Sequence, residues 1–158
     1  MTQDVHDKVA LYISRTRYPF PGQQDWPEGY YAICNAGDPK RGIETADGGM
    51  YYPDIIIVSP KDEVREVGEV EMTLDPAKIP MLRLGSETSD DRTPTKVRHF
   101  FLYVPMGLEA EAKAMLEEAG ISYAGVRGFE VTEAGIRIVP FHTAGDPYDH
   151  QITEPGLV

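Results

Sequence analysis

The chain has 158 residues, the size of one ordinary domain, and its composition of 41% hydrophobic and 26% charged residues excludes wholesale disorder. No apolar run approaches the roughly 20 residues that a membrane-spanning helix requires. Acidic residues outnumber basic ones by 26 to 15. The resulting net charge of −11 disfavours a protein that binds nucleic acid through a broadly basic surface.

The N-terminus and the cysteine content indicate the compartment. The first ten residues carry charges where a secretion signal has an apolar stretch. The single cysteine, Cys34, cannot form a disulfide within the chain. We therefore expect a cytoplasmic protein without a membrane partner.

The first half of the chain is predicted to begin with a helix and to continue with strands. Apolar side chains at helical spacing predict a helix over residues 3–15. Three runs of strand-forming residues follow, at 30–34, 51–58 and 64–72. The short turn between the last two runs predicts an antiparallel hairpin. The polar, glycine-rich segment 35–49 is expected to be a loop that is mobile or faces a ligand.

The middle of the chain predicts a second helix, a buried strand and a third helix. The second helix is expected over residues 75–84, with Pro80 interrupting it. Residues 86–94 are polar and are expected to be exposed. A nearly continuous apolar run at 99–104 predicts a buried strand, and a single apolar stripe predicts the third helix at 108–119.

The last elements complete the predicted fold class. Two strands are expected at 123–131 and 136–141, separated by a turn. Strands, helices and further strands around one core predict an α/β (α+β) domain with a mixed central sheet flanked by helices. We expect a single domain over residues 1–142 and a polar tail over 143–158.

Three acidic residues of the predicted hairpin are candidates for a chemical site. Glu69 and Glu71 are two positions apart in a strand and project from the same face. A turn centred between residues 61 and 62 places Asp54 opposite Glu69, with Cβ atoms about 4.5–5.5 Å apart. Carboxylates this close repel one another unless a cation, a proton or open water compensates their charge.

A divalent cation, Mg²⁺ or Mn²⁺, would compensate this charge because both ions bind carboxylate and carbonyl oxygens. The expected ligands are Asp54, Glu69 and the backbone carbonyl of Val70. Such an ion polarises a phosphate oxygen and lowers the pKa of a bound water, so the expected reaction is phosphodiester hydrolysis. The sequence has no glycine-rich phosphate loop and no histidine spacing typical of zinc, so we expect no other cofactor.

The hairpin also resembles a known family. Pro53-Asp54, followed fifteen positions later by Glu69-Val70-Glu71, resembles the PD-(D/E)xK signature of restriction-endonuclease-like nucleases. The predicted order of elements is similar, and the segments 101–105 and 125–129 are similar to uncharacterised microbial members of this superfamily. The resemblance implies a Mg²⁺-dependent endonuclease that hydrolyses nucleic acid with Asp54, Glu69 and Glu71. It also implies a homodimer, since small nuclease domains often need a partner to cut both strands.

The sequence departs from this signature at Glu71, where the family usually has lysine. Glutamate could accept a proton from the attacking water or bind a second ion, but it cannot supply the positive charge of lysine. Lys78, Lys96 and Arg98 are the basic residues that could restore this charge from elsewhere in the fold.

Other interpretations stay open at this point. The nuclease-like fold could be a catalytically degenerate module that binds protein or nucleic acid, as the missing lysine and the net charge indicate, or a small-molecule hydrolase. Glu69 and Glu71 could also be solvated acids on a strand face, as is expected of Glu66. The histidines, including His6, are expected to be structural or at the surface. Four tyrosines could stack on nucleobases or pack between strands: Tyr30, Tyr31, Tyr51 and Tyr52.

Overall fold

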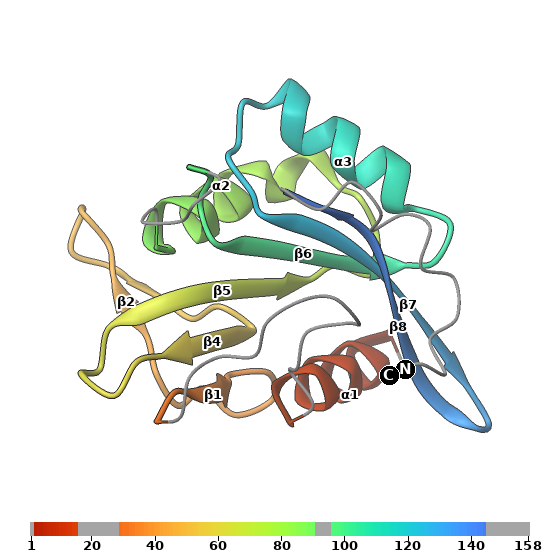
Figure 1. Cartoon of the computed structure of the whole chain (residues 1–158), viewed down its shortest axis with the longest axis horizontal. Helices are drawn as coiled ribbons and strands as arrows, with labels where there is room; N and C mark the ends of the chain where they lie inside the picture. Colours follow the sequence, from red (N-terminus) through yellow and green to blue (C-terminus); the bar gives the residue numbers. More distant parts are fainter. Residues whose placement is uncertain (1, 16–28, 91–95, 145–158) are drawn as a thin grey trace.

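A computed structural model describes residues 2–15, 29–90 and 96–144 of the chain. In these ranges the protein is a mixed α/β fold in which three α-helices cover a curled, six-stranded sheet (Figure 1). Strands β5, β6 and β7 run parallel to one another, and the remaining pairs are antiparallel. In spatial order the strands are β1 (Tyr31–Cys34), β4 (Ile55–Val58), β5 (Val64–Val70), β6 (Phe100–Pro105), β7 (Gly125–Thr132) and β8 (Gly135–Thr143). The predicted mixed sheet is therefore confirmed.

The helices divide the core between the two faces of the sheet. Helix α1 (Thr2–Arg15) lies on one face, and α2 (Ile79–Thr88) and α3 (Glu109–Glu118) lie on the other (Figure 1). Side chains alternate between the faces along a strand, so Val70 of β5 packs in the core beneath α1 and Val67 in the core beneath α2 and α3. Glu69 therefore projects toward the side of the sheet that α2 covers.

The hairpin of β4 and β5 has the pairing that the sequence predicts at its open end. Ile55 pairs with Gly68 and Ile56 with Val67, so the position before β4, Asp54, comes opposite Glu69. The register shifts by one residue nearer the turn, between Ile57 and Val58. Next to the turn, Val58 pairs with Val64 and the amide of Ser59 donates to the carbonyl of Glu63, so the turn is centred on Lys61 and not between residues 61 and 62 as expected. The register shift supplies the one-residue offset that brings Asp54 opposite Glu69.

The expected strand 51–58 is instead two strands in two different sheets. Strand β3 (Met50–Tyr51) ends before Pro53 and pairs with β2 (Ile43–Glu44), which lies in the segment predicted to be a loop. Strand β4 begins only at Ile55. Proline has no N–H to donate to a ladder, so the chain leaves one sheet and enters the other at this point.

The second helix and the polar segment after it also differ from expectation. Pro80 does not interrupt α2, because it lies in the first turn, where a missing N–H leaves no hydrogen bond unmade. The helix continues to Thr88, and Ser86 and Asp90 are buried rather than exposed. Ser86 donates a hydrogen bond to the carbonyl of Ser122, and Asp90 forms an ion pair with Arg65 at 2.7 Å.

Two further expectations are wrong in detail. Glu66 is not solvated: it is buried and lies 3.2 Å from the ring of His99. Thr143, assigned to the tail, is the last residue of β8 and pairs with Gly125. The rest of the predicted tail, residues 145–158, lies outside the described residues. No helix among the described residues is long and apolar enough to cross a membrane.

Candidate functional site

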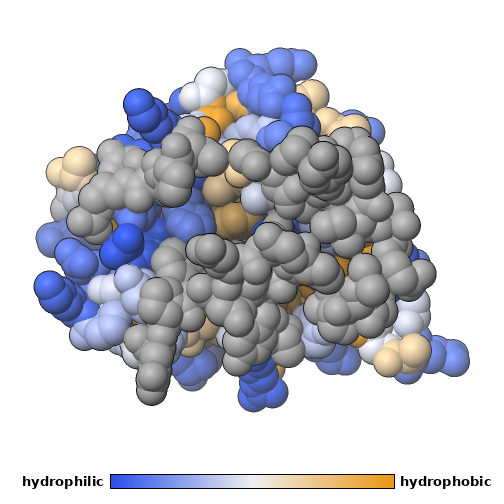
Figure 2. Space-filling model, viewed as in Figure 1, coloured by the Kyte–Doolittle hydropathy of each residue, from blue (hydrophilic) through white to orange (hydrophobic). Residues whose placement is uncertain are grey.

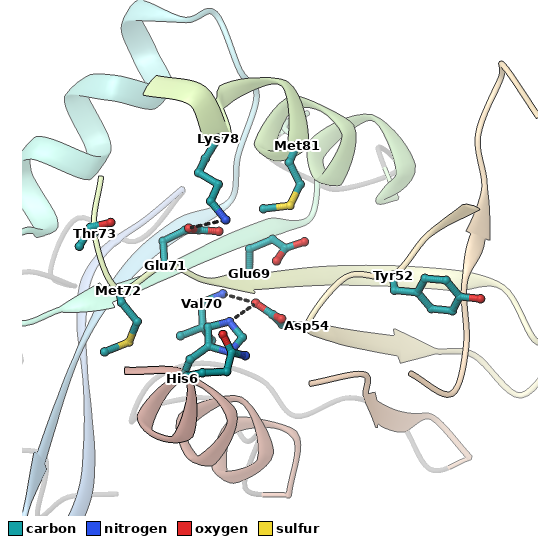
Figure 3. A pocket seen from close by; sticks show the side chains of 11 residues that line it. His6, Tyr52, Asp54, Glu69, Val70, Glu71, Met72, Thr73, Lys78 and Met81 are labelled. Atoms are coloured by element: carbon teal, nitrogen blue, oxygen red, sulfur yellow. Dashed lines mark hydrogen bonds and ion pairs between the residues drawn. The ribbon is translucent and has the colours of Figure 1, made fainter. Parts of the chain in front are cut away.

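The three acids predicted from the sequence line one cavity of about 350 Å³. The cavity lies where β4 begins and β5 ends, beneath the N-terminal end of α2 (Figure 3). Asp54 reaches it from the start of β4, and Glu69 and Glu71 from β5 and the residue after it. The hairpin register therefore concentrates carboxylates at one end of the sheet.

Asp54 is held in place through the backbone by Asn35, which follows β1. The backbone N–H of Asn35 donates a hydrogen bond to the carbonyl of Asp54 at 2.9 Å. The side-chain Nδ2 of Asn35 donates a second one to the carbonyl of Pro53 at 2.7 Å. Its Oδ1 accepts from the amides of Lys40 and Arg41. One buried asparagine thus fixes the peptide that carries the candidate ligand.

The Asp54 carboxylate lies between His6, on the α1 side of the sheet, and Glu69, on the α2 side. Its Oδ2 accepts a hydrogen bond from the amide of Val70 at 2.9 Å and lies 3.0 Å from Nε2 of His6 on α1 (Figure 3). Nδ1 of His6 lies 2.9 Å from the Asp7 carboxylate. The hydrogen bond to Asp54 is the main cause that raises the pKa of His6 to about 9, so His6 is a cation at neutral pH.

Glu69 is buried beside Asp54, and its side chain is only 2% exposed. The hydroxyl of Tyr51 donates a hydrogen bond to Oε2 of Glu69. Burial raises the pKa of Glu69 well above its usual value, and the negative charge of Asp54 raises it further. In the absence of a cation, the contact with His6 and the raised affinity of Glu69 for a proton both offset the repulsion between the two acids.

Glu71 does not join this pair, although it lines the same cavity. Its Oε1 lies 4.0 Å from Nζ of Lys78, at the end of the short 3₁₀ helix Pro76–Lys78 (Figure 3). Burial raises the pKa of Glu71, and the charge of Lys78 opposes that effect. Of the three basic residues considered from the sequence, Lys78 lines the cavity, whereas Lys96 and Arg98 do not.

The donors at the Asp54–Glu69 pair fit a hard divalent cation. Hydrogen bonds from the described residues reach Oδ2 of Asp54 and Oε2 of Glu69, and the two carboxyl groups also form a hydrogen bond with each other, so a cation would have to replace the proton between them. No three His, Cys, Asp or Glu side chains within the described ranges are grouped so that they could hold a metal by themselves. A cation would therefore need the backbone carbonyl of Val70 and water as well as the two acids.

Comparisons of the chain with protein-family models, with curated proteins and with solved structures give no match.

Three functional candidates at this site were not assigned to it by sequence reasoning. His6 was expected to be structural or at the surface, Tyr51 was one of four tyrosines without a distinct role, and Lys78 was one of three basic residues. His6 reaches Asp54 across 48 positions of sequence. The sequence has no local spacing that signals this contact, because it depends on how α1 packs on the sheet.

Proposed function

We propose that this protein is a divalent-cation-dependent nuclease that hydrolyses phosphodiester bonds at the Asp54–Glu69 pair. The observation that carries the proposal is the placing of Asp54 opposite a buried Glu69, in a cavity that also holds Lys78. The order of helix, antiparallel hairpin and parallel strands agrees with the resemblance to PD-(D/E)xK nucleases.

The side chains have separate roles in the proposed reaction. Asp54, Glu69 and the carbonyl of Val70 would hold Mg²⁺ or Mn²⁺. The backbone N–H of Glu71 faces β6, where it donates a hydrogen bond to the carbonyl of Tyr103. The carbonyl of Val70 belongs to the same trans peptide and points the opposite way, so it is expected to face Asp54. When bound, the ion polarises the phosphate and lowers the pKa of a coordinated water.

Glu71 and Lys78 would complete the reaction from the other side of the cavity. Glu71 accepts a proton from the attacking water, and its raised pKa suits it to this task. The water oxygen forms a new bond to phosphorus while the bond to the leaving oxygen breaks, and solvent protonates the leaving oxygen. Lys78 stabilises the negative charge that develops on the phosphate, the role that lysine has at the third signature position.

A cleavage assay tests this proposal. Labelled single- and double-stranded DNA and RNA are incubated with the wild type and Mg²⁺ or Mn²⁺, and Asp54→Asn is compared with Glu63→Gln, a variant of an exposed acid on the same hairpin. Asp54→Asn is expected to lose at least about 100-fold in rate, because changes in outer-shell partners alone typically cost 10–100-fold. Equal rates for these two variants, or no cleavage by the wild type, would refute the proposal.

A second pair of variants tests the relocated positive charge. Lys78→Met is expected to slow cleavage by about 100-fold, typical of the loss of one positioned electrostatic group, whereas Lys113→Met on α3 is expected to have no effect.

The main competing function is a catalytically degenerate binding module, which the missing lysine and the charge of −11 favour. A folded wild type that cleaves nothing and shows no calorimetric binding of millimolar Mg²⁺ or Mn²⁺ would support that module.

A further inference from the structure

An exposed aromatic side chain lies at the edge of the acid cavity. Tyr52 connects β3 to β4, lines the cavity with Asp54 and Glu69, and is 48% exposed. Its hydroxyl makes no hydrogen bond to any described residue, in contrast to the buried Tyr51. Figure 3 shows the ring directed away from Asp54 and from the other labelled acids. The described fold gives the Tyr52 hydroxyl no hydrogen-bond partner, and about half of the residue is exposed.

Tyr52 is part of a small apolar surface on the β2–β3 pair, which we call the Met50–Tyr52 face. Met50 is 56% exposed, and both side chains lie over Gly42. A Cβ at Gly42 would lie 2.4 Å from Cγ of Met50 and 3.0 Å from Cε1 of Tyr52. The absence of a side chain at Gly42 therefore allows both residues to lie close to the backbone. On the face shown in Figure 2, hydrophilic residues predominate at the end of the molecule where Figure 1 labels β2.

We infer that the Met50–Tyr52 face binds an unpaired nucleobase, and that the substrate of the proposed nuclease is single-stranded nucleic acid. The inference rests on the proposed function, because it takes the acids to mark the position of the scissile phosphate. A base next to that phosphate could stack on Tyr52 at the rim of the cavity. Every base has a π-face, so such stacking selects unpaired strands without selecting a sequence.

The charge of the protein disfavours recognition of a duplex along its phosphate backbone. Duplex recognition usually requires several phosphate contacts from basic side chains, and this chain carries 15 basic against 26 acidic residues. Among the described residues that line the cavity, Lys78 is the one lysine or arginine. A substrate held by one phosphate and one stacked base needs few cations. In a duplex the base faces are already stacked on one another and are not accessible to Tyr52.

The experiment measures binding separately from cleavage. The full chain is titrated, with Ca²⁺ in place of Mg²⁺, into a short single-stranded DNA that contains 2-aminopurine, whose fluorescence falls on stacking, and anisotropy is recorded in parallel. A single-stranded RNA and the matching DNA duplex are further arms. Tyr52→Ala is compared with Tyr31→Ala, a tyrosine with the same exposure of 48% that does not line the cavity.

The expected result is quenching by the wild type and by Tyr52→Trp. Tyr52→Ala is expected to bind single strands about 5- to 100-fold more weakly, the usual effect of losing one stacked base, and Tyr31→Ala is expected to bind like the wild type. Equal affinities of the two alanine variants, tighter binding of the duplex, or no binding of single strands would overturn the inference. If the wild type binds single strands through Tyr52 but cleaves nothing with Mg²⁺ or Mn²⁺, the proposed function fails and the base-binding site stands.

Discussion

The hydroxyl of Tyr51 donates its hydrogen bond to Glu69, and this contact crosses from the two-stranded pair to the central sheet. Tyr51 belongs to β3 and Glu69 to β5, so the candidate ligand is oriented by a residue outside its own sheet. Helix α2 passes close above them at Gly85, where a Cβ would lie 2.9 Å from the Tyr51 hydroxyl. The orientation of Glu69 thus depends on two neighbouring elements.

Replacing Tyr51 by phenylalanine tests this dependence. Tyr51→Phe removes the donor and keeps the ring, so the protein is expected to fold while Glu69 loses its orienting contact. Calorimetric affinity for Mn²⁺ is expected to fall by about 10- to 100-fold, as for other outer-shell partners of metal ligands. Tyr52→Phe, which removes the hydroxyl of the adjacent exposed tyrosine, is the control. A Tyr51→Phe protein that binds Mn²⁺ as tightly as this control would contradict the prediction.

Gly85→Ala is expected to destabilise the protein, against the usual trend for helices. Within a helix this change normally stabilises by about 1 kcal/mol, because glycine is a poor helix former. Here the new Cβ would lie 2.6 Å from the ring of Phe100 and would also press on Tyr51. Overpacking of this kind costs about 1–3 kcal/mol in urea unfolding. Glu87→Ala, an exposed change on the same helix, is the control, and a Gly85→Ala protein at least as stable as wild type would refute the predicted clash.

Glu69→Gln is expected to stabilise the ion-free protein at pH 7. The folded-state pKa of Glu69 is raised above the ordinary 4.5, so the folded state binds the proton more tightly than the unfolded state. Its contribution to stability therefore falls as pH rises above about 4.5 and is least favourable once Glu69 ionises in the folded protein. Glutamine keeps an acceptor for Tyr51 and removes this cost.

Thermal unfolding in EDTA measures the effect. The melting temperature of Glu69→Gln is expected to rise by about 2–4 °C for each kcal/mol gained, with a weaker pH dependence than in the wild type. Glu63→Gln, at an exposed position, is expected to change neither quantity. A melting temperature for Glu69→Gln below that of wild type throughout pH 5–8 would show that the buried acid is not a cost to folding.

His6 is expected to titrate near pH 9 in the ion-free protein. Its folded pKa is raised from 6.5, so its contribution to stability is fully present below about pH 6.5 and is lost as pH rises through about 9. Imidazole NMR signals, assigned with a His6→Gln variant, report this pKa directly. Asp54→Asn removes the main cause of the shift and is expected to lower the pKa by more than Asp7→Asn does. A His6 pKa near 6.5 in the wild type would contradict the contact with Asp54.

The sequence predicted the local parts of this site because they depend on neighbouring residues. Alternation along a strand placed Glu69 and Glu71 on one face, and the hairpin was expected with Asp54 opposite Glu69. The structure reaches this pairing through a one-residue register shift between Ile57 and Val58, not through the turn that the sequence predicted. The expected helix at residues 3–15 and the buried strand at 99–104 are also present, with small shifts in their ends. These features follow from periodicity and turn chemistry, which act over a few residues.

The break at Pro53, which separates β3 from β4, shows where local reasoning failed. The run 51–58 has the composition of one strand, but the missing N–H of proline and the hydrogen bonds from Asn35 divide it between two sheets. That division brings Tyr51 to Glu69 and leaves Tyr52 at the surface. Periodicity alone could not distinguish the two tyrosines.

The sequence by itself determined the fold class, the hairpin and the presence of paired acids, because backbone geometry and side-chain alternation are local properties of the chain. The tertiary structure alone decided which charges meet. It brought His6 to Asp54 and Lys78 to Glu71, and it left Lys96 and Arg98 outside the cavity. Such contacts depend on how helices pack on the two faces of a sheet, and that packing is set by the whole core rather than by any short segment.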